Sequence, residues 1–202
     1  MIPITIDISF DDGLIDQLKW GRYMQAVGLQ GTFYVCPGLV GTPGRLSEEH
    51  LKMLADWGHR IAGHTWGHET PQGVGVGGVV ESCQRAREWL VARRWDGDAM
   101  ALTFGTRAGV GWTTEALAAL AAQGFKALRD TRFKSERSDL YAPRIAALEL
   151  PDAMAVTLGF NAFYFHSNRN TTDEALTLFL AIVAQWKETN TARVVLANST
   201  GD

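Results

Sequence analysis

Two adjacent acidic residues near the start of the chain could take part in catalysis or metal binding. Asp11 and Asp12 follow the β-rich segment 2–10 and precede Gly13. Because consecutive side chains of an extended segment point in different directions, one carboxylate could bind a metal ion while the other faces a water molecule. An Asp-Asp-Gly sequence after a strand also occurs at ordinary turns and helix caps, so it indicates chemistry only together with other residues.

Two histidines could complete such a site. His64 and His68 follow segment 59–63, which is predicted to be a strand. Imidazoles four residues apart can bind one cation when the segment between them makes a helical turn. With Asp12 they would form a set of two histidines and one carboxylate, which holds a divalent metal ion and leaves positions open for water and substrate.

A third histidine follows another predicted strand near the end of the chain. His166 comes directly after the aromatic segment 160–165. A lone histidine in such a place is commonly structural, but His166 and Asp11 could flank the open face of the metal ion as acid and base. The two remaining histidines, His50 and His59, are expected to be ordinary structural residues.

Alternating strands and helices must position these residues. The expected strands are 2–10, 32–36, 59–63, 100–104, 125–128, 145–150, 160–165 and 194–197. The expected helices are 14–27, 47–57, 79–94, 113–123 and 172–187, and Ser47 is the expected N-cap of the second. This alternation predicts an α/β fold with a mainly parallel sheet, whose functional groups stand at the carboxyl ends of strands. The Gly-rich segment 71–78 is expected to be a loop beside the metal site.

The two motifs resemble those of the polysaccharide deacetylases of carbohydrate esterase family 4. The sequence Ser9-Phe10-Asp11-Asp12-Gly13 is similar to that family's first motif, Thr-Phe-Asp-Asp-Gly. The sequence His64-Thr65-Trp66-Gly67-His68 matches its second motif, His-Ser/Thr-x-x-His. The resemblance is strongest over residues 4–68 and more diffuse beyond them.

The resemblance implies a fold and a set of roles. The fold would be a distorted (β/α) barrel of about seven strands, formed by one catalytic domain over residues 1–202. Asp12, His64 and His68 would bind Zn²⁺, or a similar divalent ion such as Co²⁺, Ni²⁺ or Fe²⁺. Asp11 would be the catalytic base, and His166 would be the general acid.

Later parts of the chain depart from the family pattern. The family's third motif, Arg-Pro-Pro-Tyr-Gly, compares with residues 104–109, where Gly105 stands in the arginine position and Arg107 lies two positions later. Arg107 is the candidate for orienting Asp11. Asp130 is the candidate for tuning His166, but the tryptophan of the family's corresponding motif does not accompany it.

These features predict a metal-dependent hydrolase that removes N-acetyl groups from an acetylated amino sugar or polysaccharide by means of a metal-activated water. The altered third motif leaves two alternatives open. One is an amide or imide hydrolase that acts on a small non-sugar substrate, and the other is a catalytically impaired relative that binds carbohydrate. The expected partner is accordingly a carbohydrate or a small amide, and the sequence predicts no particular oligomeric state.

Composition excludes several other classes of function. The 202 residues include 19 basic and 22 acidic side chains, which gives a formal net charge of −3 and favours neither nucleic acid nor an anionic membrane as partner. No apolar stretch reaches the roughly 18–20 residues that a membrane-spanning helix needs. The first residues lack the pattern of a signal peptide, so a cytoplasmic location is expected. Cys36 and Cys83 are expected to be buried free thiols.

Overall fold

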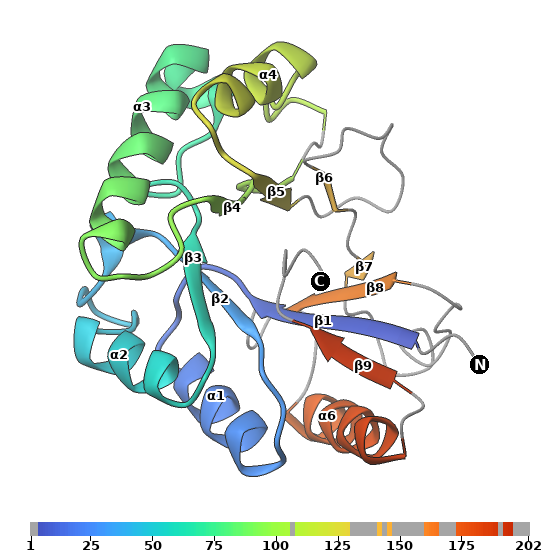
Figure 1. Ribbon diagram of the computed structural model, residues 1–202. Coiled ribbons are helices and arrows are strands. Elements are labelled where there is room, and N and C mark those ends of the chain that lie inside the picture. Colours follow the sequence, from blue (N-terminus) through green and yellow to red (C-terminus); the bar gives the residue numbers. More distant parts are fainter. Residues whose placement is uncertain are drawn as a thin grey trace.

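A curved sheet organises the chain, and helices cover its outer face (Figure 1). The computed structural model describes residues 4–105, 108–129, 141–142, 145–146, 160–165, 173–189 and 192–195. The described strands are β1 Ile4–Phe10, β2 Thr32–Val35, β3 Arg60–Gly63, β4 Ala99–Ala101, β5 Ala127–Arg129, β6 Tyr141–Ala142, β7 Ile145–Ala146, β8 Phe160–Phe165 and β9 Ala192–Val195.

The strands pair in the order β6-β5-β4-β3-β2-β1-β8-β7, and β9 pairs with β1. Every pairing between these strands is parallel. The two ends of the order, β6 and β7, are only two residues apart in the chain, so the sheet curls back toward its own start. The predicted barrel-like α/β fold is confirmed, with nine described strands where about seven were expected, because β6 and β7 are two-residue strands.

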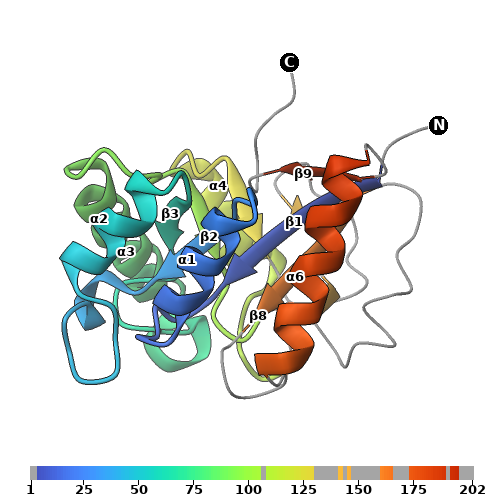
Figure 2. The ribbon, with the colours of Figure 1, turned by 90° about the horizontal axis from the view of Figure 1, so that it is seen from below.

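The helices pack against the convex side of the sheet. The described α-helices are α1 Gln17–Ala26, α2 Glu48–Asp56, α3 Pro71–Val91, α4 Thr114–Ala122 and α6 Asp173–Glu188, and the short 3-10 helix η1 Pro37–Leu39 follows the end of β2. Figure 2 shows α2, α1 and α6 side by side on this outer face. Within the described ranges, no helix combines the length and the apolar character that crossing a membrane requires.

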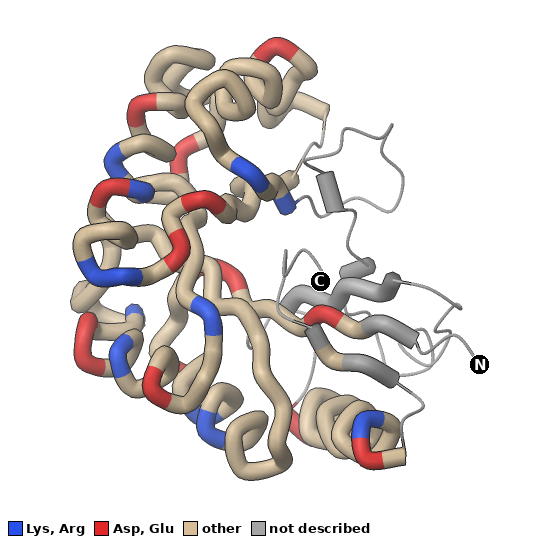
Figure 3. The backbone as a smooth tube through the Cα atoms, viewed as in Figure 1, with Lys and Arg blue, Asp and Glu red and all other residues tan. Residues whose placement is uncertain are grey.

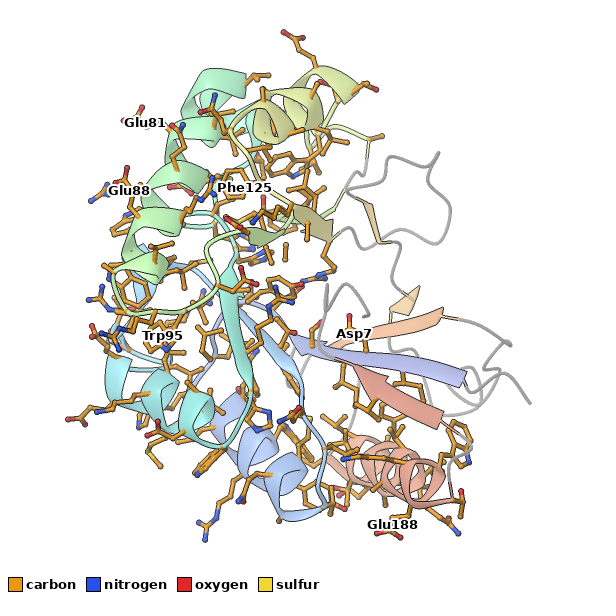
Figure 4. The ribbon with its side chains drawn as sticks, in the orientation of Figure 1. Asp7, Glu81, Glu88, Trp95, Phe125 and Glu188 are labelled. Atoms are coloured by element: carbon orange, nitrogen blue, oxygen red, sulfur yellow. The ribbon has the colours of Figure 1, made fainter. Side chains whose placement is uncertain are left out.

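Strand β1 has one apolar and one polar face. Ile6, Ile8 and Phe10 are fully buried in the main hydrophobic core, which α1, α2 and α6 complete. Because side chains alternate along a strand, Asp7 and Ser9 lie on the opposite face, where they are fully buried as well. In Figure 4, Asp7 points away from α6, toward the inside of the curved sheet. The concave side of the sheet is therefore polar next to β1.

Small side chains line the inner face of the neighbouring strands. A separate buried cluster consists of Tyr34, Ala62, Ala99, Ala101 and Ala127. The intervening residues Met100 and Leu128 lie in the core beneath α3 and α4 instead. The alanines therefore leave space on the concave side for larger polar groups from adjacent positions.

Charged side chains of both signs are interspersed along the outer helices (Figure 3). Two of these helices carry ion pairs to the segment between α3 and β4: Glu48 of α2 pairs with Arg93 at 2.8 Å, and Arg87 of α3 pairs with Asp98 at 2.5 Å. Partly exposed pairs of this kind each contribute roughly 0–1 kcal/mol to stability. The apolar core, rather than these pairs, holds the helices on the sheet.

The Gly-rich segment 71–78 is not the loop that was expected. It forms the first turns of α3, in which Pro71 occupies the first turn and the hydroxyl of the N-cap Thr70 accepts a hydrogen bond from the Gly73 amide at 3.2 Å. Gly75 interrupts the helix with φ 75°, a conformation that glycine adopts at little cost. The cap and the proline start the helix even though glycine disfavours it.

Both cysteines are buried free thiols, as predicted. Burial raises the pKa of Cys83 to about 12, and it raises that of Cys36 well above its ordinary value. The Cys36 thiol donates a hydrogen bond to the carbonyl of His64 at 3.1 Å. Neither thiol is therefore an activated nucleophile.

Two of the five histidines have structural roles, also as predicted. His50 completes the capping box of α2, because its Nδ1 accepts from the Ser47 amide at 3.1 Å while the Ser47 hydroxyl accepts from the His50 amide at 3.2 Å. His59 is buried between two backbone segments: its Nδ1 accepts from the Gly31 amide at 3.2 Å, and its Nε2 donates to the Gly21 carbonyl at 2.8 Å. This pair of contacts requires the neutral ring, and burial lowers the pKa of His59 from its ordinary value of 6.5.

We therefore expect the free energy of unfolding to fall as the pH drops below about 6.5, because the unfolded chain takes up a proton there while folded His59 stays neutral. Urea denaturation of the metal-free protein from about pH 7.5 to about pH 5 measures this loss. His59→Gln should lower stability at the higher pH and flatten the slope. An unchanged slope in that variant would contradict the assignment.

Candidate metal and catalytic site

Three side chains from separate parts of the sequence meet at one edge of the sheet. One ligand atom from each of Asp12, His64 and His68 lies within 4.8 Å of the other two. Asp12 Oδ1 is 3.4 Å from His64 Nε2 and 3.1 Å from His68 Nε2. Ligand atoms around a tetrahedral zinc ion, with bonds of about 2.0–2.1 Å, lie roughly 3.4 Å apart. The arrangement therefore fits the ligand sphere of one small divalent ion.

The sheet brings these residues together because its strands are parallel. Asp12 follows the end of β1, and His64 directly follows the end of β3. The His64 amide donates to the Val35 carbonyl at the end of β2 at 2.8 Å, which fixes the start of the histidine segment against the neighbouring strand. Because the carboxyl ends of parallel strands lie at one edge of the sheet, Asp12 and His64 are in contact although 52 positions separate them in the sequence.

A hydrogen bond selects the ring nitrogen that His64 offers. Its Nδ1 contacts the Ala101 carbonyl at the end of β4 at 2.8 Å. A carbonyl can only accept, so Nδ1 carries a proton, and in the neutral ring the lone pair that a metal ion would use is on Nε2, on the side of Asp12. Histidine ligands of metal ions are commonly oriented by such a second contact. The imidazole of His64 is therefore prepared to bind a cation through Nε2.

Backbone strain is concentrated at the same residues. Asp12, Thr65 and His68 adopt positive φ values of 73°, 60° and 71°. A residue with a Cβ in this conformation costs about 1–2 kcal/mol. Such strain is retained where the surrounding structure determines the conformation, and functional sites are the usual location.

The neighbouring carboxylate has a different partner. Asp11 is 1% exposed, and its Oδ1 accepts a hydrogen bond from Nη2 of Arg129, whose side chain is also 1% exposed. The Arg129 guanidinium lies 4.9 Å from the centre of the Tyr34 ring. The side-chain amide of Gln17 donates to the Asp11 carbonyl oxygen. Asp11 and Asp12 therefore point to separate partners, one to a guanidinium and the other to the histidines.

Sequence reasoning missed Arg129. The comparison of residues 104–109 with the family's third motif favours Arg107 instead. Arg107 lies outside the described residues, as do Asp130 and His166. Arg129 is the last residue of β5 and pairs in register with Ala101 of β4. The signal was present in the sequence, because an arginine directly follows the expected strand 125–128, and alternation places it on the same face as Ala127.

An aromatic side chain borders the open side of the site. Phe104, just after β4, is 47% exposed and adopts φ 57°. Its ring lies edge-on to that of His68 with 4.8 Å between centroids, and the His68 ring lies edge-on to that of His64 at 5.0 Å. His68 is the more accessible of the two histidines, with 22% side-chain exposure against 2%. Solvent and substrate would therefore approach past His68 and Phe104.

Comparisons by sequence identify no relative: no family model and no curated protein matches the chain.

Comparisons of structure find proteins with a similar fold. A family 4 carbohydrate esterase from Streptomyces lividans matches with a TM-score of 0.65 at 12% identity, covering 98% of this chain and 92% of its own. The Bc1960 peptidoglycan N-acetylglucosamine deacetylase matches with a TM-score of 0.68 at 14% identity, covering 96% and 86%. The peptidoglycan deacetylase PdaC from Bacillus subtilis matches with a TM-score of 0.63 at 13% identity, covering 95% and 87%.

The chain has the fold of the family 4 carbohydrate esterases. The resemblance seen in two short motifs thus extends to the fold of the described residues. At these identities the likeness establishes the deacetylase fold alone.

Loss of one partner of the buried ion pair between Asp11 and Arg129 should lower the stability of the fold more than loss of both. Arg129→Met leaves a buried carboxylate without its guanidinium and should lower the free energy of unfolding by about 3–5 kcal/mol. Adding Asp11→Asn to Arg129→Met should recover part of that loss, because the buried charge is removed as well. Urea denaturation of the two single variants and the double variant measures the effect. Wild-type stability in Arg129→Met would show that the pair does not hold Asp11.

Proposed function

We propose that this chain is a metal-dependent hydrolase that removes N-acetyl groups from an acetylated amino sugar or polysaccharide. The observation that carries the proposal is the meeting of Asp12, His64 and His68 beside a second carboxylate, Asp11, that is held separately. The deacetylases that share the fold support an acetylated carbohydrate as the substrate class.

The donor set fits a divalent ion, with Zn²⁺ the first choice and Co²⁺, Ni²⁺ or Fe²⁺ as alternatives. Nε2 of His64, Nε2 of His68 and the carboxylate of Asp12 would hold it. When bound, such an ion lowers the pKa of its water and polarises a carbonyl group. Three protein ligands leave positions open for the water and for the acetamide oxygen.

Asp11 would accept the proton of the attacking water. Its carboxylate is adjacent in the chain to the ligand Asp12, and the hydrogen bond from Arg129 to Oδ1 fixes its orientation. Both side chains are almost completely buried, so the carboxylate cannot rotate away into solvent. A base held in one direction loses little entropy when the reaction begins. Arg129, rather than Arg107, is thus our candidate for the residue that orients the base.

The leaving amine requires a proton, and His166 is the proposed donor. It is the next residue after β8, whose last residue, Phe165, pairs in register with Phe10. Asp11 is likewise the next residue after Phe10, so the chain order supports base and acid on neighbouring strands. Water adds to the acetyl carbonyl, the C–N bond breaks, and the products are acetate and a free amino group.

Catalysis can be tested by acetate release from N-acetylated chitooligosaccharides. Asp11→Asn should lower turnover at least about 10²–10⁴-fold, because the base is lost, while zinc remains bound. His64→Ala should lose both turnover and zinc. Glu88→Gln is the control, since Glu88 points outward from α3 (Figure 4). Full acetate release by Asp11→Asn would contradict the mechanism, and release from small amides or imides alone would favour the non-sugar alternative.

Metal binding can be tested without substrate. A ligand that binds only the folded chain raises its stability by about 2.7 kcal/mol at one hundred times its dissociation constant. Zn²⁺ should therefore raise the thermal midpoint of the metal-free wild type and leave that of His64→Ala unchanged. The same increase in both proteins would place the zinc elsewhere.

A further inference from the structure

The turn that carries the two histidines is bound to helix α3 through two polar side chains. Between His64 and His68 the chain passes through Thr65, Trp66 and Gly67. Thr65 and His68 have positive φ values, so the turn lacks the regular hydrogen bonds of a helix or strand. Its partly buried amide groups therefore need other acceptors, because an amide that is shielded from water and left unpaired is costly.

Glu69 and Ser82 provide these acceptors. The Trp66 amide donates to the Ser82 hydroxyl oxygen at 2.8 Å. The Ser82 hydroxyl donates to Oε2 of Glu69 at 2.7 Å, and the same oxygen accepts from the Gly67 amide at 2.8 Å. Two consecutive amides of the turn are therefore linked to each other through one carboxylate and one hydroxyl.

The link joins the turn to a rigid part of the molecule. Ser82 lies on α3 beside Val79, Cys83 and Ala86, which are fully buried in the core beneath that helix. The Glu69 carboxylate lies so close to the turn that a Cβ at Gly67 would be 2.9 Å from its Oε1. The turn is thus held at a fixed distance from α3.

His68 depends on this turn more than His64 does. His64 is buried, and its Nδ1 is oriented by the Ala101 carbonyl. His68 is more exposed. Its Nε2 lies 3.1 Å from Asp12 Oδ1, and its ring makes edge-on contacts with His64 and Phe104, which impose weaker directional limits than a hydrogen bond. The direction of its Nε2 is therefore set largely by the backbone that precedes Glu69.

We propose that Glu69 and Ser82 are positioning residues for the metal ion: together they hold the turn so that Nε2 of His68 completes the ligand set with Asp12 and His64. The proposal rests on the metal site of the proposed function. It concerns affinity for the ion, so it can be tested apart from deacetylation.

The test is zinc binding by the metal-free protein in competition with a chromophoric chelator. Glu69→Ala and Ser82→Ala should each weaken zinc affinity, by up to the roughly 10–100-fold that follows loss of a direct hydrogen-bond partner of a metal ligand, because here the effect passes through the backbone of the turn. Glu69→Gln should stay close to wild type, because its side-chain oxygen can accept both hydrogen bonds. Glu81→Ala is the matched control, since Glu81 is the exposed neighbour of Ser82 and points outward from α3 (Figure 4).

Two further measurements separate positioning from general stability. The double variant Glu69→Ala/Ser82→Ala should lose little more affinity than the weaker-binding single variant, because both residues act through one chain of hydrogen bonds. The visible spectrum of bound Co²⁺ should change in Glu69→Ala and not in Glu81→Ala, which a mere loss of stability would not produce.

Wild-type zinc affinity in both Glu69→Ala and Ser82→Ala would overturn the positioning role and leave the metal site intact. Absence of zinc binding by the wild type would instead contradict the proposed function itself, and with it this role.

Discussion

The parallel alignment of β1 with its neighbours is the constraint on which the rest of the structure depends. Strand β1 pairs with β2, β8 and β9, all in the same direction. Its outer face is buried against helices, and its inner face carries Asp7 and Ser9 into the interior. Because the strands run in one direction, their carboxyl ends form a single edge, where Asp11, Asp12 and His64 all lie.

A second constraint follows from placing carboxylates inside a sheet. Asp11 is almost completely buried, so it needs a compensating charge that is equally buried, and Arg129 supplies it. The guanidinium fits there because the inner face of β3, β4 and β5 consists largely of alanine, with the Tyr34 ring beside it. The small alanine side chains thus leave the space in which the Arg129 guanidinium can pair with the buried Asp11 carboxylate.

Much of this arrangement could be predicted from the sequence, because local pattern determines it. Alternation indicated the strands, Ser47 marked the start of α2, and the spacing of His64 and His68 indicated a shared ligand site. The position of Arg129 directly after the expected strand 125–128 could have marked it as a candidate, but the choice between Arg129 and Arg107 depends on the pairing of β4 with β5, which local sequence does not specify. Segment 71–78 was predicted to be a loop because glycine disfavours a helix, whereas the helix-start signals of Thr70 and Pro71 indicate the helix that forms.

Asp12, His64 and His68 should surround one divalent ion, and X-ray absorption at the zinc edge of the zinc-loaded wild-type protein reports the ligands of that ion. We expect two imidazole nitrogens and additional oxygen ligands at about 2.0–2.2 Å. A sulfur ligand at about 2.3 Å, which would implicate Cys36 or Cys83, or fewer than two imidazoles, would contradict it.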